Sequence, residues 1–304
     1  AFLKVHHPAE FMAAVISNQG GFYSAFAYVS EARRLGLEVL PPDVNAGAAR
    51  WTGKENALRV GLLSIKDLAT ATRERIVACR KDRPYAGLGD FLERVRPDAA
   101  ELRALVHCGA LDGLAPGAGR GELLWEAARR RQARPTAGRA ARHRPLFEAP
   151  GAGDRTPRLP PDDARERLRR EFAVLGFLCD RHPMALYADA VQRAGAVKAV
   201  DVPRRVGKRV CFAGWLITGK AVETKKGEPM EFLTFEDETG LVEATFFPEA
   251  YRRFCHLLDC GRPYLLSGRV EEDWGAVTLT VETTSALPVP AGAHRSRAEA
   301  LKSH

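Results

Sequence analysis

Five short apolar runs in the last third of the chain constrain its fold more than any other feature. Each is rich in β-branched and aromatic residues and bounded by turn residues, as β-strands are, and they cover 210–217, 230–237, 241–247, 264–270 and 276–281. Between the third and fourth runs, Pro248 to Leu258 has the apolar spacing of a short helix. Three strands, a helix and two strands is the order of an OB-fold, a barrel that commonly binds single-stranded nucleic acid. The runs alone would fit any small β-barrel, and the helix favours an OB-fold over 207–288.

Positive charge is concentrated outside this predicted barrel. The chain carries a net charge of +8, and residues 129–170 contain thirteen arginines and five acidic residues. The stretch 208–288 contains nine basic and thirteen acidic residues, so the barrel is no general trap for phosphates. A basic chain usually has a nucleic-acid partner. Here the arginines fit equally well a solvated linker over 132–161, which is rich in Arg, Pro, Ala and Gly and has little periodicity.

Length and composition exclude several classes of protein. A chain of 304 residues has room for two or three domains, and no apolar run reaches the length of a membrane span. The first four residues have neither the apolar core of a signal peptide nor a methionine, so we expect the chain to begin inside a longer protein. The six cysteines form no Cys-x-x-Cys pair, which favours buried cytosolic thiols. Cys255, His256 and Cys260 could ligate a metal in principle, although packing at a helix end is the interpretation we favour.

Paired helical patterns with a tight turn between them dominate the region 51–131. The first pair covers 62–80 around a turn at 66–69, with Thr70 as the expected N-cap of its second helix. The second pair runs from Asp98 through a turn at Gly109 to a helix over about 120–131. Such pairs are typical of helix-hairpin-helix units, which hold duplex DNA through turn N–H groups and the positive end of the second helix. Any small helical bundle gives similar periodicity, so the pattern by itself leaves that alternative open.

Several motifs, in order along the chain, resemble the bacterial DNA polymerase III α subunit, a family C polymerase. They are His7-Pro8-Ala9-Glu10-Phe11-Met12-Ala13-Ala14, Glu31 to Gly36, Leu40 to Asn45, Ile65-Lys66, Gly109-Ala110-Leu111-Asp112, Leu175-Gly176-Phe177 with His182-Pro183, and Thr234 to Gly240. Together they cover about residues 1 to 288. The stretch 17–24 resembles the error-prone, damage-tolerant branch more than the main replicative branch.

The resemblance implies an α+β multidomain arrangement for a C-terminal fragment. It comprises the end of the polymerase fingers (1–50), a tandem helix-hairpin-helix region (51–131), the linker (132–161), a helical connector (162–206), the OB-fold (207–288) and a flexible tail (289–304). It also implies that the catalytic palm lies outside this chain. Two-metal phosphoryl transfer needs paired carboxylates, and no Asp-x-Asp occurs here in a plausible strand. We therefore expect no catalytic or metal-binding residue, no cofactor in this fragment, and Mg²⁺ only in the complete polymerase.

Two positions depart from the family pattern. The family's first hairpin usually carries glycines that let the backbone approach a phosphate, and here Asp67 and Ala69 stand in those places. Sliding-clamp motifs commonly begin with Gln and end in Leu-Phe, whereas the apolar island here follows His143. Leu146 and Phe147 remain the candidate clamp-binding pair. Recruitment through translesion accessory proteins is the alternative.

These patterns lead to one functional hypothesis and one alternative. We expect the fragment to handle DNA for an error-prone polymerase in replication and translesion repair, in the cytoplasm at the nucleoid. The alternative is an independent OB-fold adaptor that binds single strands and has no enzymatic role. Duplex contacts are expected at Lys66, Thr70, Arg73, Gly109 and Arg120, and contacts with a single-stranded template at Lys225, Lys226, Phe232 and Thr234.

Alternation along the second barrel strand singles out Phe232. Leu233 and Phe235 fall on one face of that strand, and Met230, Phe232 and Thr234 fall on the other. In OB-folds of the resembling family the position of Phe235 belongs to the core. Phe232 is therefore the candidate for stacking on an unpaired base, with burial in a core as its alternative.

Overall fold

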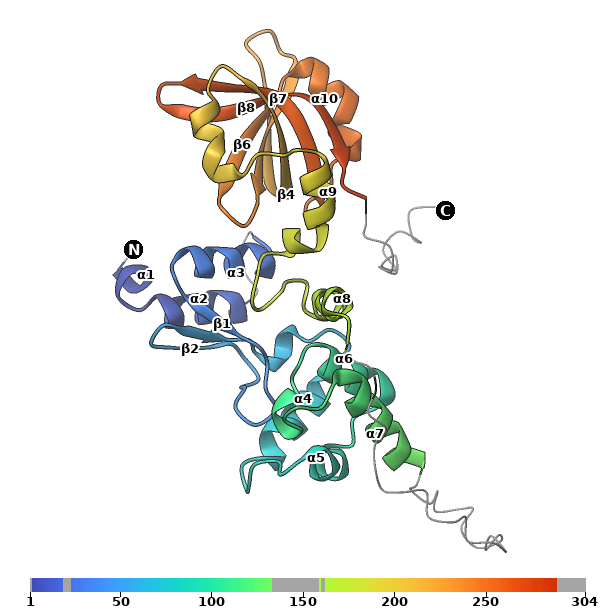
Figure 1. The fold of residues 1–304 in the computed structure, drawn as a ribbon. Helices are drawn as coiled ribbons and strands as arrows, with labels where there is room; N and C mark the ends of the chain where they lie inside the picture. The colour runs from blue at the N-terminus through green and yellow to red at the C-terminus, as the bar shows by residue number, and fades with distance from the viewer. Residues whose placement is uncertain (1, 19–22, 133–158, 160–161, 289–304) are drawn as a thin grey trace, which may run out of the picture. The chain divides into compact units, whose positions relative to one another are not determined.

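The computed structural model describes residues 2–18, 23–132, 159 and 162–288, and its contacts divide the chain into two compact units. Unit 1 is Ala1–Asp180 and unit 2 is Arg181–His304. Unit 1 is largely helical and unit 2 is a β-barrel with short helices (Figure 1). The predicted connector 162–206 is divided between them, since its first helix falls in unit 1 and the rest in unit 2. None of the described helices is both long and apolar enough to cross a bilayer.

Unit 1 begins with three helices and a small sheet, and the second and third helices pack on the sheet. The helices are α1 (Phe2–His6), α2 (Pro8–Asn18) and α3 (Ala25–Arg34). The strands β1 (Glu38–Leu40), β2 (Thr52–Lys54) and β3 (Ala57–Arg59) form a sheet in the order β1-β3-β2, parallel between β1 and β3 and antiparallel between β2 and β3. No such sheet is evident from the sequence, because three-residue strands are too short to show a period of two.

The two predicted helix pairs are present in the rest of unit 1. The first comprises the 3₁₀ helix η1 (Leu62–Ser64) and α4 (Thr70–Cys79), and α5 (Leu88–Val95) follows it. The second comprises α6 (Ala99–His107), the 3₁₀ helix η2 (Asp112–Leu114) and α7 (Arg120–Gln132). Helix α8 (Ala164–Leu175) closes the unit, with Asp163 as its N-cap and Gly176, at φ +81°, as its C-cap. Leu105, Leu111 and Ile76 are fully buried, so the apolar stripes seen in the sequence form the core of this unit.

Unit 2 is a closed five-stranded barrel in the strand order β4-β5-β6-β8-β7 (Figure 1). Its strands are β4 (Arg209–Glu223), β5 (Pro229–Glu236), β6 (Leu241–Phe246), β7 (Pro263–Asp273) and β8 (Ala276–Ala286). Helix α10 (Pro248–Phe254) and the 3₁₀ helix η5 (Cys255–Leu257) lie between β6 and β7. The order of three strands, a helix and two strands confirms the predicted OB-fold.

The barrel interior is filled by the side chains that alternate inward. Phe212, Phe235, Phe246, Leu266 and Leu279 are all completely buried. A bulge between Ser267 and Gly268 brings β7 against β8, where a Cβ on Gly268 would lie 2.0 Å from the carbonyl oxygen of Thr280. Only glycine permits that approach, so this position is required for closure of the barrel.

Short helices cover one end of the barrel. They are the 3₁₀ helix η3 (Pro183–Tyr187), α9 (Ala188–Arg193) and the 3₁₀ helix η4 (Ala199–Arg205). Asp237 in the β5–β6 turn accepts the backbone N–H of Ala199 at 2.9 Å, and the rings of Tyr187 and Trp215 lie 6.2 Å apart. The covering segment is therefore tied to the barrel by both polar and aromatic contacts.

Candidate nucleic-acid interface

The turn of the first hairpin keeps the backbone shape of a glycine turn without its glycines. Asp67 adopts φ +62°, a left-handed conformation that favours glycine. The turn also contacts its own chain: the Lys66 N–H donates to the carbonyl of Val174 at 3.2 Å, and Lys66 Nζ donates to the carbonyl of Ala173 at 3.3 Å. Both acceptors lie in the last turn of α8, where a cation is favourable. Lys66 is exposed, so it can cap α8 and still face solvent.

Thr70 is not the N-cap of α4. The cap is Ala69, whose side chain has no acceptor, and Thr70 is the first helical residue. The Thr70 hydroxyl instead accepts a hydrogen bond from the Arg73 guanidinium at 2.6 Å. The sequence prediction was wrong here because a threonine one residue later gives the same local signal. Thr70 and Arg73 nevertheless lie together at the start of the helix that follows the turn.

Glu101 is a buried residue of this region that was not predicted from the sequence. Its carboxylate accepts the N–H of Ala69 at 3.2 Å and the N–H of Asp98 at 2.8 Å, and only 5% of the residue is exposed. The second bond belongs to a capping box with Asp98 at the start of α6. Asp-x-x-Glu before an apolar run could have revealed the capping box, but no local signal shows the bond to the first hairpin. Glu101 thus joins the two helix pairs and uses one of the turn N–H groups that would otherwise be available to a phosphate.

The second hairpin has a glycine where the sequence predicts one. Gly109 adopts φ +82°, and a Cβ there would lie 2.5 Å from a guanidinium nitrogen of Arg120. Arg120 Nη1 donates to the carbonyl of His107 at 2.7 Å, and Nη2 donates to Asp112 at 3.0 Å. The Arg120 side chain is only 11% exposed. The geometry therefore gives Arg120 a role in closing the hairpin, and its predicted contact with DNA remains a prediction.

Carboxylates of the chain itself occupy the N-terminus of α7. Glu122 accepts the N–H of Gly119 at 2.9 Å, and Asp162 accepts the N–H of Arg120 at 3.1 Å. A hollow of about 400 Å³ lies beside them, lined by residues that include Gly117 and Arg167. The positive end of this helix, which would attract a phosphate, is already partly neutralised in this structure.

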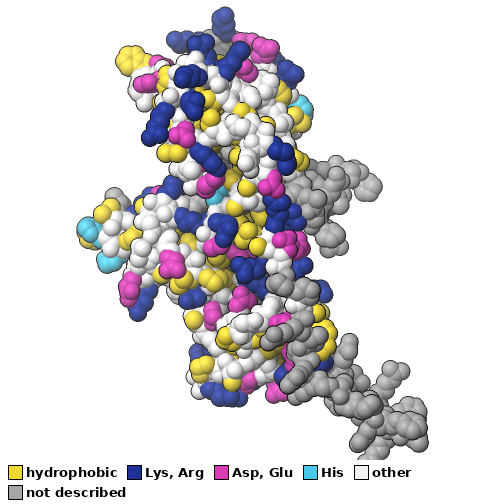
Figure 2. All heavy atoms as spheres, in the orientation of Figure 1, with side chains coloured by type: hydrophobic (Ala, Val, Ile, Leu, Met, Phe, Trp, Pro, Cys, Tyr) yellow, Lys and Arg dark blue, Asp and Glu magenta, His cyan; other side chains and the backbone are white. Residues whose placement is uncertain are grey.

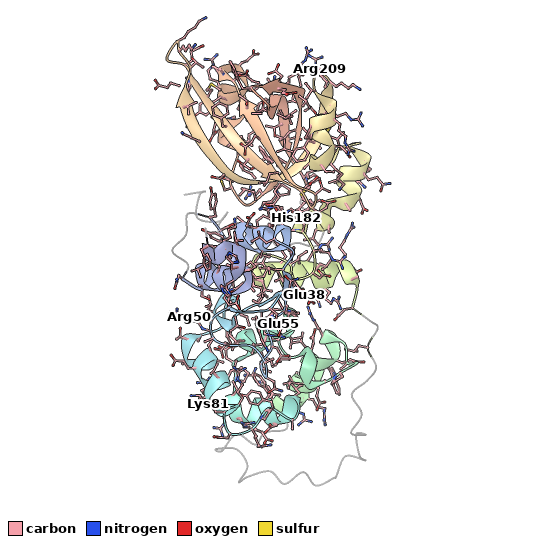
Figure 3. The ribbon with its side chains drawn as sticks, turned by 90° about the vertical axis from the view of Figure 1, so that its left-hand side faces the viewer. Glu38, Arg50, Glu55, Lys81, His182 and Arg209 are labelled. Atoms are coloured by element: carbon pink, nitrogen blue, oxygen red, sulfur yellow. The ribbon has the colours of Figure 1, made fainter. Side chains whose placement is uncertain are left out.

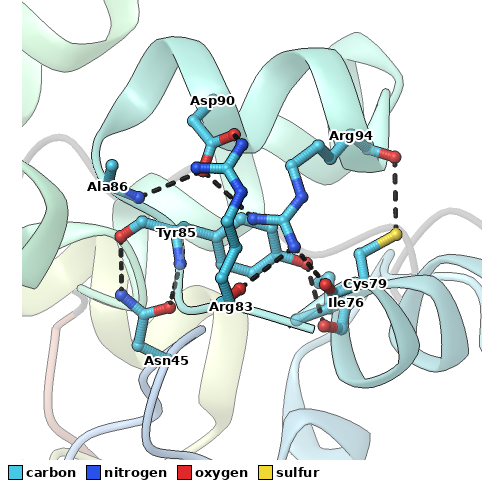
Figure 4. A network of polar contacts seen from close by, with 8 residues as sticks. All are labelled: Asn45, Ile76, Cys79, Arg83, Tyr85, Ala86, Asp90 and Arg94. Atoms are coloured by element: carbon cyan, nitrogen blue, oxygen red, sulfur yellow. Dashed lines mark hydrogen bonds and ion pairs between the residues drawn. The ribbon is translucent and has the colours of Figure 1, made fainter. Parts of the chain in front are cut away.

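A polar network holds the loop between α4 and α5 (Figure 4). Asn45 exchanges two hydrogen bonds with the backbone of Tyr85, and the Tyr85 hydroxyl donates to the carbonyl of Ile76 at 2.9 Å. The Arg94 guanidinium lies 4.6 Å from the centre of the Tyr85 ring and pairs with Asp90 at 3.1 Å. Burial raises the pKa of Tyr85 to about 12, and the Ala86 N–H, followed by Arg94, lowers the pKa of Asp90. These contacts join the loop to α4, to α5 and to the segment that carries Asn45.

Basic side chains form no continuous surface on the face shown in Figure 2, where Lys and Arg are interspersed with Asp and Glu. His107, half-buried at the end of α6, has its pKa lowered by burial and then by the charge of Arg170. Arg120 and Arg103 lower the pKa of His107 in the same direction as Arg170, so several arginines lie near this end of α6. Positive charge at the second hairpin is therefore local, and it does not belong to one large basic patch on the face shown.

Phe232 is exposed on the outer face of the barrel. It keeps 41% of its surface accessible, whereas Leu233 and Phe235 on the opposite face of β5 are buried. The alternative in which Phe232 belongs to a core is therefore wrong. Lys225 and Lys226 are exposed in the β4–β5 turn, which the Thr224 hydroxyl holds by accepting the N–H groups of Lys226 and Glu228.

The strand register places other polar residues in line with Phe232. Lys220 on β4 and Thr245 on β6 are its direct partners, and the row continues through Thr280 on β8 to Arg269 on β7. In the neighbouring row, the Thr234 hydroxyl donates to Glu243 at 2.9 Å. Alternation in the sequence cannot assign Lys220 and Arg269 to one row, because their strands are far apart in the chain. The row thus has a positive residue at each end, Lys220 directly beside Phe232 and Arg269 three strands away, and Thr245 between them is buried.

His182 is the N-cap of η3, the first of the short helices that pack on the barrel. It is buried, its Nδ1 accepts the N–H of Met184 at 3.2 Å, and its Nε2 lies 3.6 Å from a carboxylate oxygen of the buried Glu236. Figure 3 shows His182 and Arg209 at opposite ends of unit 2. The hydrogen bond from Met184 gives His182 a structural role at the start of η3.

Two predicted features concern metals and the clamp. Among the described residues no group of three His, Cys, Asp or Glu side chains is placed to hold a metal ion, Cys255 to Cys260 included. The clamp candidates Leu146 and Phe147 lie outside the described residues. So do the 289–304 tail and the predicted 132–161 linker, except for residues 132 and 159.

Comparisons with known proteins support a separate candidate region in each unit. A family model described as "Helix-hairpin-helix motif" matches residues 36–123, and one described as "OB-fold nucleic acid binding domain" matches residues 210–286. An error-prone DNA polymerase of Corynebacterium efficiens is 32% identical over 95% of this chain and 26% of its own length. One of Symbiobacterium thermophilum is 30% identical over 92% of this chain and 30% of its own length. The chain thus spans between a quarter and a third of the length of these relatives.

The likeness to solved structures is weak. A domain of replication protein A from Methanococcus maripaludis is 17% identical, covers 27% of this chain and 86% of its own length, and gives a TM-score of 0.24. The family models and the curated relatives carry the assignment.

Proposed function

We propose that this chain, which is homologous to a part of bacterial error-prone DNA polymerases, is the C-terminal portion of such an enzyme and handles its DNA. In this proposal the helix-hairpin-helix region binds duplex and the barrel binds the single-stranded template. The observation that carries it is the tandem of two nucleic-acid-binding domains within one stretch of similarity that covers 95% of the chain. The similarity includes unit 1, so an independent barrel-only adaptor has less support.

The barrel's contribution rests on Phe232. An exposed aromatic ring offers a stacking surface to any base, and a row with Lys220 on one side and Arg269 on the other favours a phosphate backbone. Glu243 lies in the next row, so the face is not uniformly attractive to phosphates. We infer weak, salt-sensitive binding that depends on the rest of a polymerase to keep the strand nearby.

The duplex contribution rests on the exposed groups at the first turn. Lys66 faces solvent, and Thr70 and Arg73 lie at the start of the next helix. The second turn contributes Gly109, while its arginine is largely buried. Replacing Lys66 by Ala should lower the slope of duplex affinity against salt concentration by about one unit if it contacts one phosphate. An unchanged slope would remove Lys66 from the interface.

Phe232→Ala tests the template site directly. We expect affinity for fluorescent oligo(dT) to fall roughly tenfold to hundredfold, since stacking on one ring is worth about 1–3 kcal/mol. The melting temperature should change little because the ring is 41% exposed. Leu257→Ala is the matched control, since Leu257 is a similarly exposed apolar residue, at 49%, that lies on η5 outside the strand rows. Equal affinities for all three proteins would refute the stacking role.

Primer extension by a larger polymerase that contains this segment tests the whole proposal. The larger polymerase that contains this segment should extend a primed template, and the Phe232→Ala and Lys66→Ala forms should do so with weakened template and duplex affinity. Full activity and affinity in a form that lacks the segment would contradict a role in DNA handling.

A further inference from the structure

The tip of the β7–β8 hairpin carries the most exposed large hydrophobic side chain in the described part of the protein. Trp274 is fully accessible, at 101%, whereas the next most exposed, Val5, is at 72%. Trp274 and Gly275 form the two-residue turn between the strands, with φ +52° and +81°. Figure 1 shows this hairpin extending beyond the body of the barrel.

The requirements of the turn do not explain the tryptophan. Two-residue turns with both φ values positive favour Asn-Gly, Asp-Gly or Gly-Gly, and a bulky residue there is an outlier. An indole that touches nothing also gains no burial. Trp274 therefore combines an unfavourable backbone conformation with full exposure, and a residue kept in such a conformation points to a function.

The tip is also strongly acidic. Glu271, Glu272 and Asp273 directly precede Trp274 and are all exposed. Within the described residues no ion pair involves any of the three, and Glu271 accepts a hydrogen bond from the Thr280 hydroxyl at 2.6 Å. The carboxylates thus remain available to a cationic partner.

Glu271, Glu272 and Asp273 lie on an open edge of β7. They pair with β8, but the pairing of β7 with β4 ends at Arg209 and Arg269, and the neighbouring backbone bonds join Val270 to Gly207 and Lys208. Charged residues on an open edge commonly prevent unwanted strand pairing. That explanation covers the carboxylates and fails for Trp274, because an exposed aromatic ring promotes association.

We propose that the acidic-aromatic tip, Glu271 to Trp274, docks an arginine-bearing segment of a partner protein. A planar guanidinium stacks on an indole face and at the same time pairs with a carboxylate, which a lysine ammonium does less well. A nucleic-acid strand fits the tip less well because three carboxylates would lie beside its phosphates. This interaction goes beyond the proposed DNA handling and does not depend on it.

Labelled deca-arginine and deca-lysine peptides are suitable probes, with oligo(dT) as the nucleic-acid arm. At an ionic strength near 0.15 M, where exposed charges are screened beyond about 8 Å, we expect deca-arginine to bind more tightly than deca-lysine. Trp274→Ala should weaken deca-arginine binding roughly 30-fold, as the loss of an aromatic hot spot does. Trp274→Phe should retain most of the affinity. Oligo(dT) affinity should be the same in all three proteins.

Two further measurements separate the tip from other acidic surfaces of the protein. Binding of deca-arginine should shift the tryptophan emission of the wild type, and this shift should be absent in Trp274→Phe. A Glu271→Gln, Glu272→Gln, Asp273→Asn variant should weaken both peptides and keep Trp274. The melting temperatures of these variants should equal that of the wild type, since every replaced side chain is exposed.

Three results would overturn the proposal. Deca-arginine affinity that is unchanged in Trp274→Ala would show that the ring is not part of a docking site. Equal binding of the two peptides would reduce the tip to a simple acidic surface. Loss of oligo(dT) affinity alone in Trp274→Ala would make Trp274 a base-stacking residue instead. None of these outcomes alters the prediction for Phe232, so failure here is distinguishable from failure of the proposed template binding.

Discussion

Replacing Arg120 by Ala distinguishes a structural arginine from a DNA-contacting one. The guanidinium joins the carbonyl of His107, at the end of α6, to Asp112 beyond the turn, with distances of 2.7 Å and 3.0 Å. The Arg120 side chain is 11% exposed and that of Asp112 is 50% exposed. The ion pair is therefore screened by solvent, and the bond to the carbonyl contributes most of the stabilisation.

The expected loss follows from these two contacts. A hydrogen bond from a charged donor is worth about 1.5–3 kcal/mol, and a half-exposed ion pair adds less than about 1 kcal/mol. We therefore expect Arg120→Ala to lower the free energy of unfolding of unit 1 by about 2–3 kcal/mol. For a unit of this size each kcal/mol moves the melting temperature by about 2–4 °C, so the total shift is about 4–12 °C.

Calorimetry and a salt titration of duplex binding together show whether Arg120 stabilises the hairpin or contacts DNA. Arg103→Ala, which removes an exposed arginine from α6, is the matched control and should leave the melting temperature unchanged. Gly109→Ala should destabilise the same hairpin, because its Cβ would lie 2.5 Å from the Arg120 guanidinium, and the double variant should lose less than the sum of the single losses. An unchanged melting temperature with a salt slope lower by about one unit would refute this reasoning and make Arg120 a phosphate contact.

Four other perturbations have defined outcomes. Phe235→Ala, which empties a fully buried position in the barrel, should cost about 3–5 kcal/mol in a chemical denaturation of unit 2. Glu101→Ala leaves the N–H groups of Ala69 and Asp98 without their acceptor and should cost unit 1 about 2–4 kcal/mol. Folding lowers the pKa of His107 from 6.5. The neutral imidazole therefore contributes its full stability above pH 6.5, and this stability is lost as the pH falls through the folded pKa. His107→Gln should flatten the pH dependence of the melting temperature between pH 7.5 and 5. The purified chain should incorporate no nucleotide on a primed template with Mg²⁺ or Mn²⁺, and incorporation that survives controls for contaminating polymerase would contradict the fragment interpretation.

Strand positions in the barrel were predictable because they depend on local alternation. The predicted runs 210–217, 241–247 and 264–270 lie almost entirely within β4, β6 and β7, yet β4 continues to Glu223 and β8 to Ala286. The missed parts are polar or small, as in Thr218-Gly219-Lys220, and they form strands because they pair with neighbours across the sheet. Tertiary pairing overrides weak local propensity in these segments.

Helix ends show the same division. Asp163 and Gly176 bound α8 with standard capping chemistry that a sequence reveals. The N-cap of α4 was misplaced because Ala69 has no capping side chain, and a carboxylate 32 residues away accepts its N–H instead. A partner that distant leaves no periodic signal in the chain.

The sequence by itself determined the order of elements in the barrel, the inward and outward faces of its strands and the turn at Gly109, because these follow from side-chain alternation and from backbone preferences of single residues. Only the tertiary structure decided that Arg120 is buried in its hairpin, that Lys66 meets the end of α8, and that Phe232 remains exposed. The physical reason is that a side chain's type fixes which bonds it can make, whereas the approach of segments distant in the chain decides which partners and how much solvent it meets.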